Sequence, residues 1–296
     1  MHKDEVGKLE TIESYAQTQP SGVQAFEMDY ALKNENPRIV LLRPKDSKIG
    51  ARAADIMSRE AKAGKADPTK QIAYDYTMSF ADDKHMTCSA VSYWGYYKAS
   101  DGKFIIPEMR STPNPKLTQL YSKTGINPEP MLTAADMELD SRFDLLLEFR
   151  DHRLISDSRL REAVAQSLFK WMSDLDYTIR PGFKSFVIDD IIFPLHKTKL
   201  WPMIKGLTGL SIPPDAPEGF IETLDALNSI SDVLYKRVFD ENSKYFKQSG
   251  WNMTHNQMMA VLETYRQADY QKCRSSGVTQ FHQAFTSRTC LPKTNR

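Results

Sequence analysis

The sequence predicts an α+β protein in which a small antiparallel sheet is followed by a mostly helical region. Alternating, strand-like patterns occur in roughly the first 110 residues, whereas long segments with apolar residues every three or four positions follow them. A chain of 296 residues is long enough for two domains. We therefore expect one domain at residues 1–112 and a helical extension of unknown role at residues 113–296.

The N-terminal part contains two main predicted strands and two main predicted helices, and a short strand followed by a helical turn is expected within residues 21–34. Leu9–Tyr15 and Arg38–Pro44 are rich in β-branched and aromatic or aliphatic residues, which favours strands. Ser47–Ala63 has helical apolar spacing and is expected to end at Gly64. Cys88–Ala99 is expected to form the second helix.

The C-terminal part contains three predicted helices, at about residues 157–175, 218–238 and 254–272. Thr254 with Gln257 three residues later forms a capping-box pattern at the start of the third helix. The polar tail after Cys273 is expected to be loosely ordered.

Composition narrows the possible classes of function. The net charge of +1 argues against a protein that binds nucleic acid mainly through phosphate contacts. No apolar run reaches the about 20 residues that span a bilayer, and the best candidate, Phe186–Leu195, is interrupted by Asp189 and Asp190. The residues after Met1 do not resemble a secretory signal. A hairpin with almost no first strand suggests that further sequence precedes this chain.

The three cysteines, Cys88, Cys273 and Cys290, do not form a disulfide framework. Cys273 and Cys290 form a pair or remain two free thiols, and the sequence does not decide between these alternatives. The six histidines are scattered and no CxxC motif occurs, so a zinc site is not supported. We expect no metal and no organic cofactor.

The most informative stretch is residues 74–99, in which a small polar loop leads into Cys88 and an aromatic-rich helix begins there. The positive end of a helix dipole and its free N–H groups stabilise a thiolate and lower the pKa of the thiol. A thiolate is the nucleophile of cysteine hydrolases and acyltransferases. The alternative is that Cys88 is an ordinary buried cysteine.

Three segments appear in a recognisable order: "TIESY", then "GVQAFEMDYAL…RIVLLRP", then "YDYTMSF…CSAVSYWGYYKA". Their order and spacing, over roughly residues 1–100, resemble the permuted papain-like amidases, the YiiX/YaeF group of NlpC-like cysteine hydrolases found in bacteria. The resemblance implies a permuted papain-like (NlpC-like) antiparallel sheet with packed helices. It also implies that Cys88 attacks the amide bonds of a peptide or acyl-amide substrate, such as a cell-wall peptide, in the cell envelope or periplasm.

The resemblance also assigns roles to other residues. Glu13 would be the third member of the catalytic triad, the residue that orients the imidazole. The alternative is that Glu13 is an ordinary solvated glutamate on a strand. The base is either His2, placed opposite Thr11 and on the face of Glu13, or a histidine on missing upstream sequence. His85 is expected to be a loop histidine near the mouth of the site, because the base should approach from across the cleft.

Further residues complete this expectation. The backbone N–H of Cys88 is a candidate oxyanion donor. Asp75 is expected to bind loop backbone, and Tyr74 and Tyr76 to line the cleft or to pack. The chain departs from the family at Ala90, where the family has glutamate.

Two other functions remain open. A catalytically silent binding or scaffold protein would keep the papain-like shape without a proper base. An acyltransferase, as in the related lecithin:retinol acyltransferase group, would use the same cysteine with an acceptor other than water.

Overall fold

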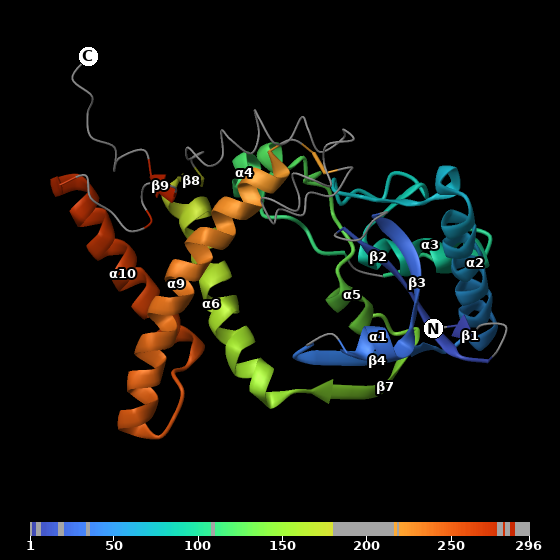
Figure 1. Cartoon of the computed structure of the whole chain (residues 1–296), viewed down its shortest axis with the longest axis horizontal. Coiled ribbons are helices and arrows are strands. Elements are labelled where there is room, and N and C mark those ends of the chain that lie inside the picture. Colours follow the sequence, from blue (N-terminus) through green and yellow to red (C-terminus); the bar gives the residue numbers. More distant parts are fainter. Residues whose placement is uncertain are drawn as a thin grey trace, which may run out of the picture. The chain divides into compact units, whose positions relative to one another are not determined.

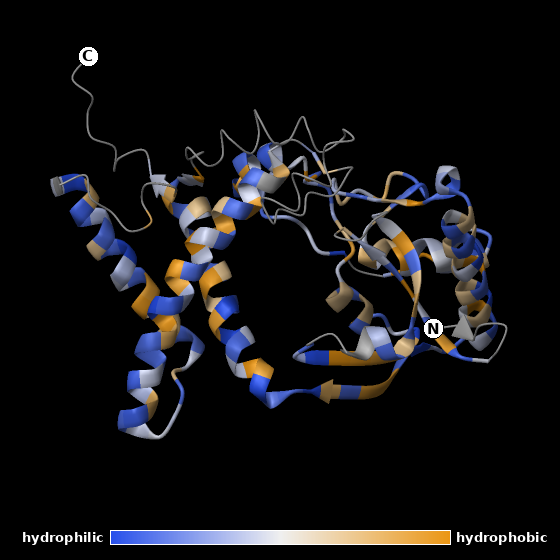
Figure 2. Cartoon of the chain, viewed as in Figure 1, coloured by the Kyte–Doolittle hydropathy of each residue, from blue (hydrophilic) through white to orange (hydrophobic). Residues whose placement is uncertain are grey.

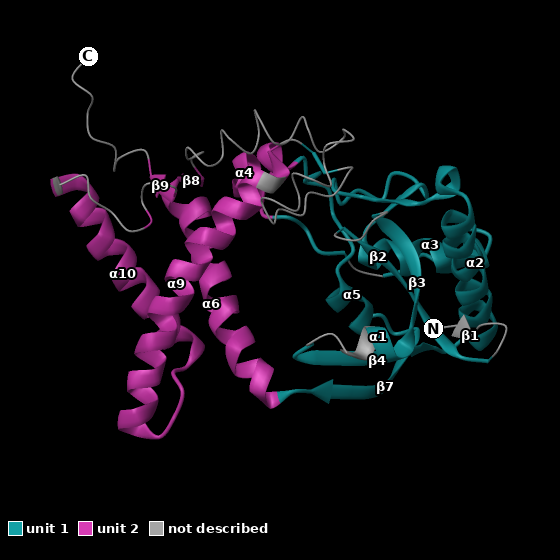
Figure 3. Ribbon diagram, viewed as in Figure 1, with its two compact units in different colours: residues 1–113, 125–151, 199–217 teal, residues 114–124, 152–198, 218–296 magenta. Residues whose placement is uncertain are grey.

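The computed structural model shows a mixed α+β protein with small sheets (Figure 1). It describes residues 2–3, 7–16, 21–33, 36–107, 110–179, 216–217, 219–276, 281 and 285–287. The chain divides into two compact units (Figure 3). The described part of unit 1 comprises residues up to 113, residues 125–151 and residues 216–217, and unit 2 comprises the rest. The chain therefore passes between the units more than once.

The described part of unit 1 contains seven strands and four α-helices. The strands are β1 (His2–Lys3), β2 (Leu9–Tyr15), β3 (Gly22–Glu27), β4 (Arg38–Pro44), β5 (Ala73–Tyr74), β6 (His85–Met86) and β7 (Phe143–Arg150). The helices are α1 (Met28–Lys33), α2 (Ser47–Ala66), α3 (Cys88–Ala99) and α5 (Ala134–Glu138).

The sheets of unit 1 are short. Strands β1, β2 and β3 form an antiparallel sheet in that order. Two further sheets have two strands each: β4 pairs antiparallel with β7, and β5 pairs parallel with β6. The strands β2 and β3 pair along their whole length, from Glu10 opposite Glu27 to Tyr15 opposite Gly22. Gly22 adopts a φ of 112° and lies against the backbone at Ile72 and Ala73, where a side chain would collide.

One face of this sheet covers helices α2 and α3. Ile12 of β2 and Ala25 of β3 lie opposite each other and contact a buried cluster that contains Met57 of α2 and Val91 of α3. Because side chains alternate along a strand, Ser14 lies on this same face, where it is 4% exposed. The prediction of a small antiparallel sheet with the Cys88 helix packed on it is confirmed at this level.

Two boundaries differ from the prediction. Helix α2 does not end at Gly64 but continues to Ala66 and stops before Pro68. Gly64 lies inside the helix and packs closely on Gln71, where a Cβ would approach within 2.7 Å of the side-chain amide oxygen. The sequence predicts a mostly helical region after residue 113 and no strand there, whereas Phe143–Arg150 form strand β7.

Unit 2 is built around three long helices, α6 (His152–Leu175), α9 (Phe220–Ser249) and α10 (His255–Ser276). The short elements are α4 (Thr118–Thr124), β8 (Tyr177–Ile179) and β9 (Phe285–Ser287), and β8 pairs antiparallel with β9. Trp171, Leu234 and Leu262 contribute almost fully buried side chains to one core. All three predicted C-terminal helices are present: α6 begins earlier than predicted and ends as predicted, whereas α9 and α10 begin close to their predicted starts and end later.

The capping box at the start of α10 is confirmed. The Gln257 side chain accepts from the backbone N–H of Thr254 at 2.8 Å, and Thr254 Oγ1 accepts from the N–H of Gln257 at 3.3 Å. Within the described residues, no helix is long and apolar enough to cross a membrane. The segment Phe186–Leu195 lies outside the described residues.

Candidate active site

Cys88 is the first residue of α3 and is an exposed, free thiol. Thr87 is the N-cap residue, and its Oγ1 accepts a hydrogen bond from the N–H of Ala90 at 3.2 Å. The N–H groups of Cys88 and Ser89 have no acceptor among the described residues, as expected for the first turn of a helix. The thiol therefore lies at the positive end of a helix of 12 residues.

Three hydrogen bonds fix the start of this helix. Ser14 Oγ donates to the carbonyl oxygen of Met86 at 2.6 Å, and the N–H of Asp75 donates to the same oxygen at 3.3 Å. Ser89 Oγ donates to the carbonyl oxygen of Leu132 at 2.7 Å. The helix start is therefore tied to β2, to β5–β6 and to the segment that precedes α5.

Tyr74 belongs to the surroundings of Cys88. The parallel pairing of β5 with β6 places Tyr74 opposite Met86, two residues before Cys88. Burial raises the pKa of Tyr74 to about 12, and the negative charges of Cys88 and Asp75 add to this shift. A phenol with a pKa this high stays protonated and is a hydrogen-bond donor over the whole physiological pH range. Tyr74 also contacts Tyr76, with ring centroids 4.9 Å apart.

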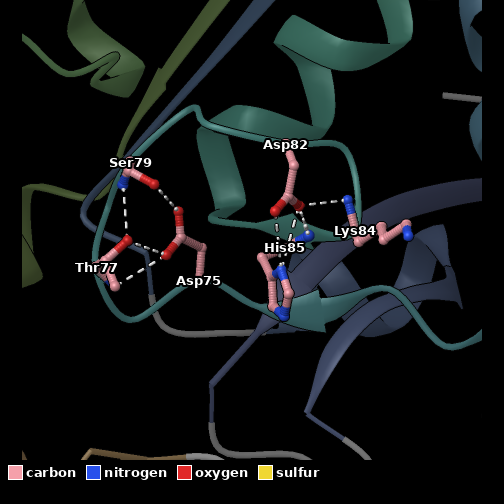
Figure 4. Close-up of polar contacts among 6 residues, drawn as sticks. All are labelled: Asp75, Thr77, Ser79, Asp82, Lys84 and His85. Carbon is pink, nitrogen blue, oxygen red and sulfur yellow. Dashed lines mark hydrogen bonds and ion pairs between the residues drawn. The ribbon is translucent and has the colours of Figure 1, made fainter.

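Asp75 organises the loop that follows β5. Its carboxylate accepts from the N–H of Thr77 at 2.9 Å, from Thr77 Oγ1 at 2.6 Å and from Ser79 Oγ at 3.4 Å (Figure 4). Asp75 is 5% exposed, and both of its carboxylate oxygen atoms accept hydrogen bonds from this loop. The prediction that Asp75 binds loop backbone is confirmed.

His85 is held by a carboxylate. Its Nδ1 lies 3.2 Å from Asp82 Oδ1, and the same oxygen accepts from the N–H groups of Lys84 and His85 at 2.8 and 3.0 Å (Figure 4). The hydrogen bond from the Lys84 N–H is the largest cause of a lowered pKa of Asp82, to which His85 also contributes. The His85 side chain is 56% exposed. It is a loop-facing histidine three residues before Cys88, and its Nε2 has no partner among the described residues.

Glu13 lies on the face of β2 opposite to the one that packs on α2 and α3. It shares that face with Thr11 and Tyr15, and Tyr15 contacts Phe26 of β3 with ring centroids 5.2 Å apart. Glu13 makes no hydrogen bond or ion pair with another described residue. The structure therefore does not bring Glu13 to the side of the sheet on which the core contacts α3.

His2 does not occupy the predicted register. It pairs with Glu10 of β2, whereas the prediction placed it opposite Thr11. Glu10 and Glu13 lie on opposite faces of the strand, because their positions differ by an odd number. The predicted position of His2 opposite Thr11, on the face of Glu13, was therefore wrong by one residue of register.

The other two cysteines are separate from this site. Cys273 of α10 is 8% exposed and disulfide-bonded, and Cys290 lies outside the described residues. Within the described part of the chain, no group of three or more histidine, cysteine, aspartate or glutamate side chains is arranged to hold a metal ion.

Sequence reasoning missed three residues that position the site. Ser14 and Ser89 have partners in other segments, Met86 and Leu132, and no local pattern identifies such contacts. The partners of Asp82 are only two and three residues away, at Lys84 and His85, which is the spacing of a local turn. The alternation of β2 carried a partial signal for Ser14, because a serine between Ile12 and the strand end falls on the apolar face. Comparison of the chain with protein-family models, with curated proteins and with solved structures finds no match.

Proposed function

We propose that this protein is a cysteine hydrolase of amide bonds, with Cys88 as its nucleophile. The observation that carries the proposal is the position of Cys88: a free, exposed thiol at the first residue of α3, beside the unpaired N–H groups of the first helical turn. The alternative of an ordinary buried cysteine does not fit this exposure. The order of the motifs around Cys88, which resembles that of the permuted papain-like amidases, is the second support for the proposal.

The reaction requires a base as well as a nucleophile. In this proposal the base is His85, whose Nδ1 is fixed by Asp82 and whose Nε2 is left to accept the thiol proton. This role differs from the sequence-based assignment of His85 to the mouth of the site, and it leaves Glu13 outside the catalytic group. His85 is the described imidazole that lies nearest to Cys88 along the chain.

The chemical steps follow from these groups. The Cys88 thiolate attacks the carbonyl carbon, and the N–H groups of Cys88 and Ser89 stabilise the oxyanion together with the Tyr74 hydroxyl. The C–N bond then breaks, and the leaving amine takes the proton from the imidazolium. Water, deprotonated by the imidazole, hydrolyses the thioester and releases the acid and the free thiol.

The substrate class rests on the resemblance, which points to cell-wall peptides or another amide or ester acyl donor in a bacterial cell envelope. The disulfide at Cys273 supports an oxidising compartment of this kind. An acyltransferase differs only in the acceptor that attacks the thioester.

One observation favours a catalytically silent protein as a second candidate. Among the described residues, no hydrogen bond joins an imidazole or carboxylate to the Cys88 sulfur, and a silent protein would keep the fold without this contact. Reaction with a thiol-directed acyl probe separates the two. Labelling of the wild type, but not of Cys88→Ser, supports the chemistry, whereas equal labelling of both excludes Cys88 as the nucleophile.

The same experiment tests the base. His152→Gln is the matched control for His85→Gln, because His152 is an exposed histidine at the start of α6 in unit 2. Loss of labelling in His85→Gln alone supports the assignment of the base. Unchanged labelling in both variants would leave Cys88 as the nucleophile and reject His85. Product analysis with water and with an amine acceptor then distinguishes hydrolysis from acyl transfer.

A further inference from the structure

Unit 2 contains a cavity of about 190 Å³, lined by the first turns of α6, by α9 and α10, and by the connection between these two helices. Its buried lining includes the apolar side chains of Leu160 and Met258, which are 4% and 2% exposed, and Ile155 and Met253 line it as well. Figure 2 shows that α6 begins with hydrophilic residues and that apolar residues follow within its first turns. A concave site with apolar walls and a few convergent polar groups is the usual form of a small-molecule site.

Helix α6 supplies three exposed polar side chains to this cavity, those of His152, Ser156 and Arg159. Because they are four and then three positions apart, they lie on one face of the helix. None of the three side chains makes a hydrogen bond or an ion pair with another described residue. Arg159 carries five N–H donors and no acceptor, and these donors are therefore available to a ligand.

A chain of hydrogen bonds fixes which atoms of Asn252 are left for a ligand. The backbone N–H of Met253 donates to Asn242 Oδ1 at 2.8 Å, and Asn242 Nδ2 donates to Asn252 Oδ1 at 3.0 Å. A backbone N–H can only donate, so it identifies the oxygen of Asn242 and, through Asn242, the oxygen of Asn252. Asn242 is 8% exposed, which keeps this arrangement away from water. Asn252 lines the cavity with its Nδ2 donors unused by any other described residue.

The charge and the donors of the lining select the class of ligand. None of the described lining residues is acidic, and Arg159 provides their one permanent charge. A carboxylate matches the planar fork of a guanidinium, with which it forms two parallel hydrogen bonds. A dianion would keep one charge unmatched and would place charged oxygen atoms against apolar side chains. The lining therefore suits a single carboxylate attached to an apolar body.

We propose that this cavity binds a small monocarboxylate with an apolar tail. The carboxylate accepts hydrogen bonds from Arg159 and from Asn252 Nδ2, and the tail contacts Leu160 and Met258. The volume of about 190 Å³ limits the ligand to a small molecule, because sites for drug-sized ligands occupy about 300–1,000 Å³. The described lining belongs wholly to unit 2, so this inference is independent of the chemistry at Cys88.

Isothermal titration calorimetry of the full-length chain with defined probes tests the ligand class. Hexanoate or benzoate should bind to the wild type. Acetate lacks the apolar tail and hexan-1-ol lacks the charge, so each should bind at least about tenfold more weakly than hexanoate. A wild type that binds neither hexanoate nor benzoate would overturn the proposal. Equal affinity for hexan-1-ol, or tighter binding of inorganic phosphate than of hexanoate, would also overturn it.

Three variants locate the site, with circular dichroism verifying that each is folded. Arg159→Gln removes the charge and should raise the dissociation constant of hexanoate at least about tenfold. Asn252→Asp keeps an oxygen that accepts from Asn242 but replaces the free donors with a negative charge, and should abolish binding. Arg274→Gln is the matched control, because it removes an exposed charge from the last turn of α10, and should leave the affinity unchanged. Wild-type affinity in folded Arg159→Gln or in folded Asn252→Asp would overturn the proposal.

Discussion

The buried hydroxyl of Ser14 donates a hydrogen bond of 2.6 Å to the carbonyl oxygen of Met86, two residues before the exposed thiol of Cys88. This contact joins the middle of the β1-β2-β3 sheet to the short strand that enters α3. It makes the position of the helix start a property of the sheet, although Ser14 and Met86 are 72 residues apart in the sequence.

Ser14→Ala should therefore affect both stability and the reactivity of Cys88. Loss of a buried hydrogen bond lowers the free energy of unfolding by about 1–2 kcal/mol, and the Met86 carbonyl keeps only the weaker contact with Asp75. Urea denaturation and the rate of Cys88 alkylation measure the two effects. Ser249→Ala, at the exposed end of α9, should change neither. Wild-type alkylation in a destabilised Ser14→Ala protein would show that this contact does not position the thiol.

Asp136 gives unit 1 a pH dependence with a definite sign. Its carboxylate accepts from the N–H of Thr133 at 2.7 Å and from Ser111 Oγ at 2.9 Å. Burial raises the pKa of Asp136, but these hydrogen bonds outweigh burial and lower it below the usual 3.8. The stabilisation is thus complete above about pH 4, and is lost as the pH falls through the lower pKa of the folded state.

Asp136→Asn should accordingly lower the free energy of unfolding by about 1 kcal/mol at neutral pH. It should also make the decrease of this free energy in acid less steep. Denaturation curves at pH values on both sides of 4 measure this. Asp101→Asn is a suitable control, because Asp101 is 73% exposed in its ion pair with Arg52. An Asp136→Asn protein with an unchanged acid profile would contradict the assignment.

Leu234 tests the core of unit 2. It is fully buried in α9, whereas Leu224 on the same helix is 38% exposed. Leu234→Ala should lower the free energy of unfolding by about 2–5 kcal/mol because it leaves a cavity. Leu224→Ala should cost much less. Equal losses in the two variants, measured by far-UV circular dichroism in denaturant, would be inconsistent with the described core.

The state of the cysteines can be counted directly. Cys273 is disulfide-bonded and Cys88 is free, and the chain has three cysteines. A thiol reagent should titrate one thiol per chain in denaturant without reductant, and three after reduction. Three thiols before reduction would contradict the disulfide at Cys273.

Local patterns predicted the elements that carry their own signals. Helix α3 begins at Cys88 and ends at Ala99 as expected, because Thr87 caps it and a polar turn follows. Strands β2 and β4 match their predicted limits, since each is short and bounded by polar residues. These features depend on neighbouring residues, so the sequence alone is sufficient to identify them.

Features that depend on distant pairing were not predictable in this way. Strand β7 has nearly continuous apolar residues rather than alternation, and its assignment depends on pairing with β4 about 100 residues earlier. The register of His2 depended on the length of one turn, and a difference of one residue changed the face. The contact between His85 and Asp82 is seen only in the folded loop, and the sequence favoured a loop role for His85 because the base was expected from across the cleft.

The most direct test of the central claim is the formation and decay of an acyl adduct on Cys88, followed by intact-mass spectrometry with an activated ester or amide probe. The account predicts that the wild type gains one acyl group and then loses it to water, that Cys88→Ser gains none, and that Asp82→Asn acylates more slowly. An adduct that forms equally in Cys88→Ser, or no adduct in the folded wild type, would contradict it.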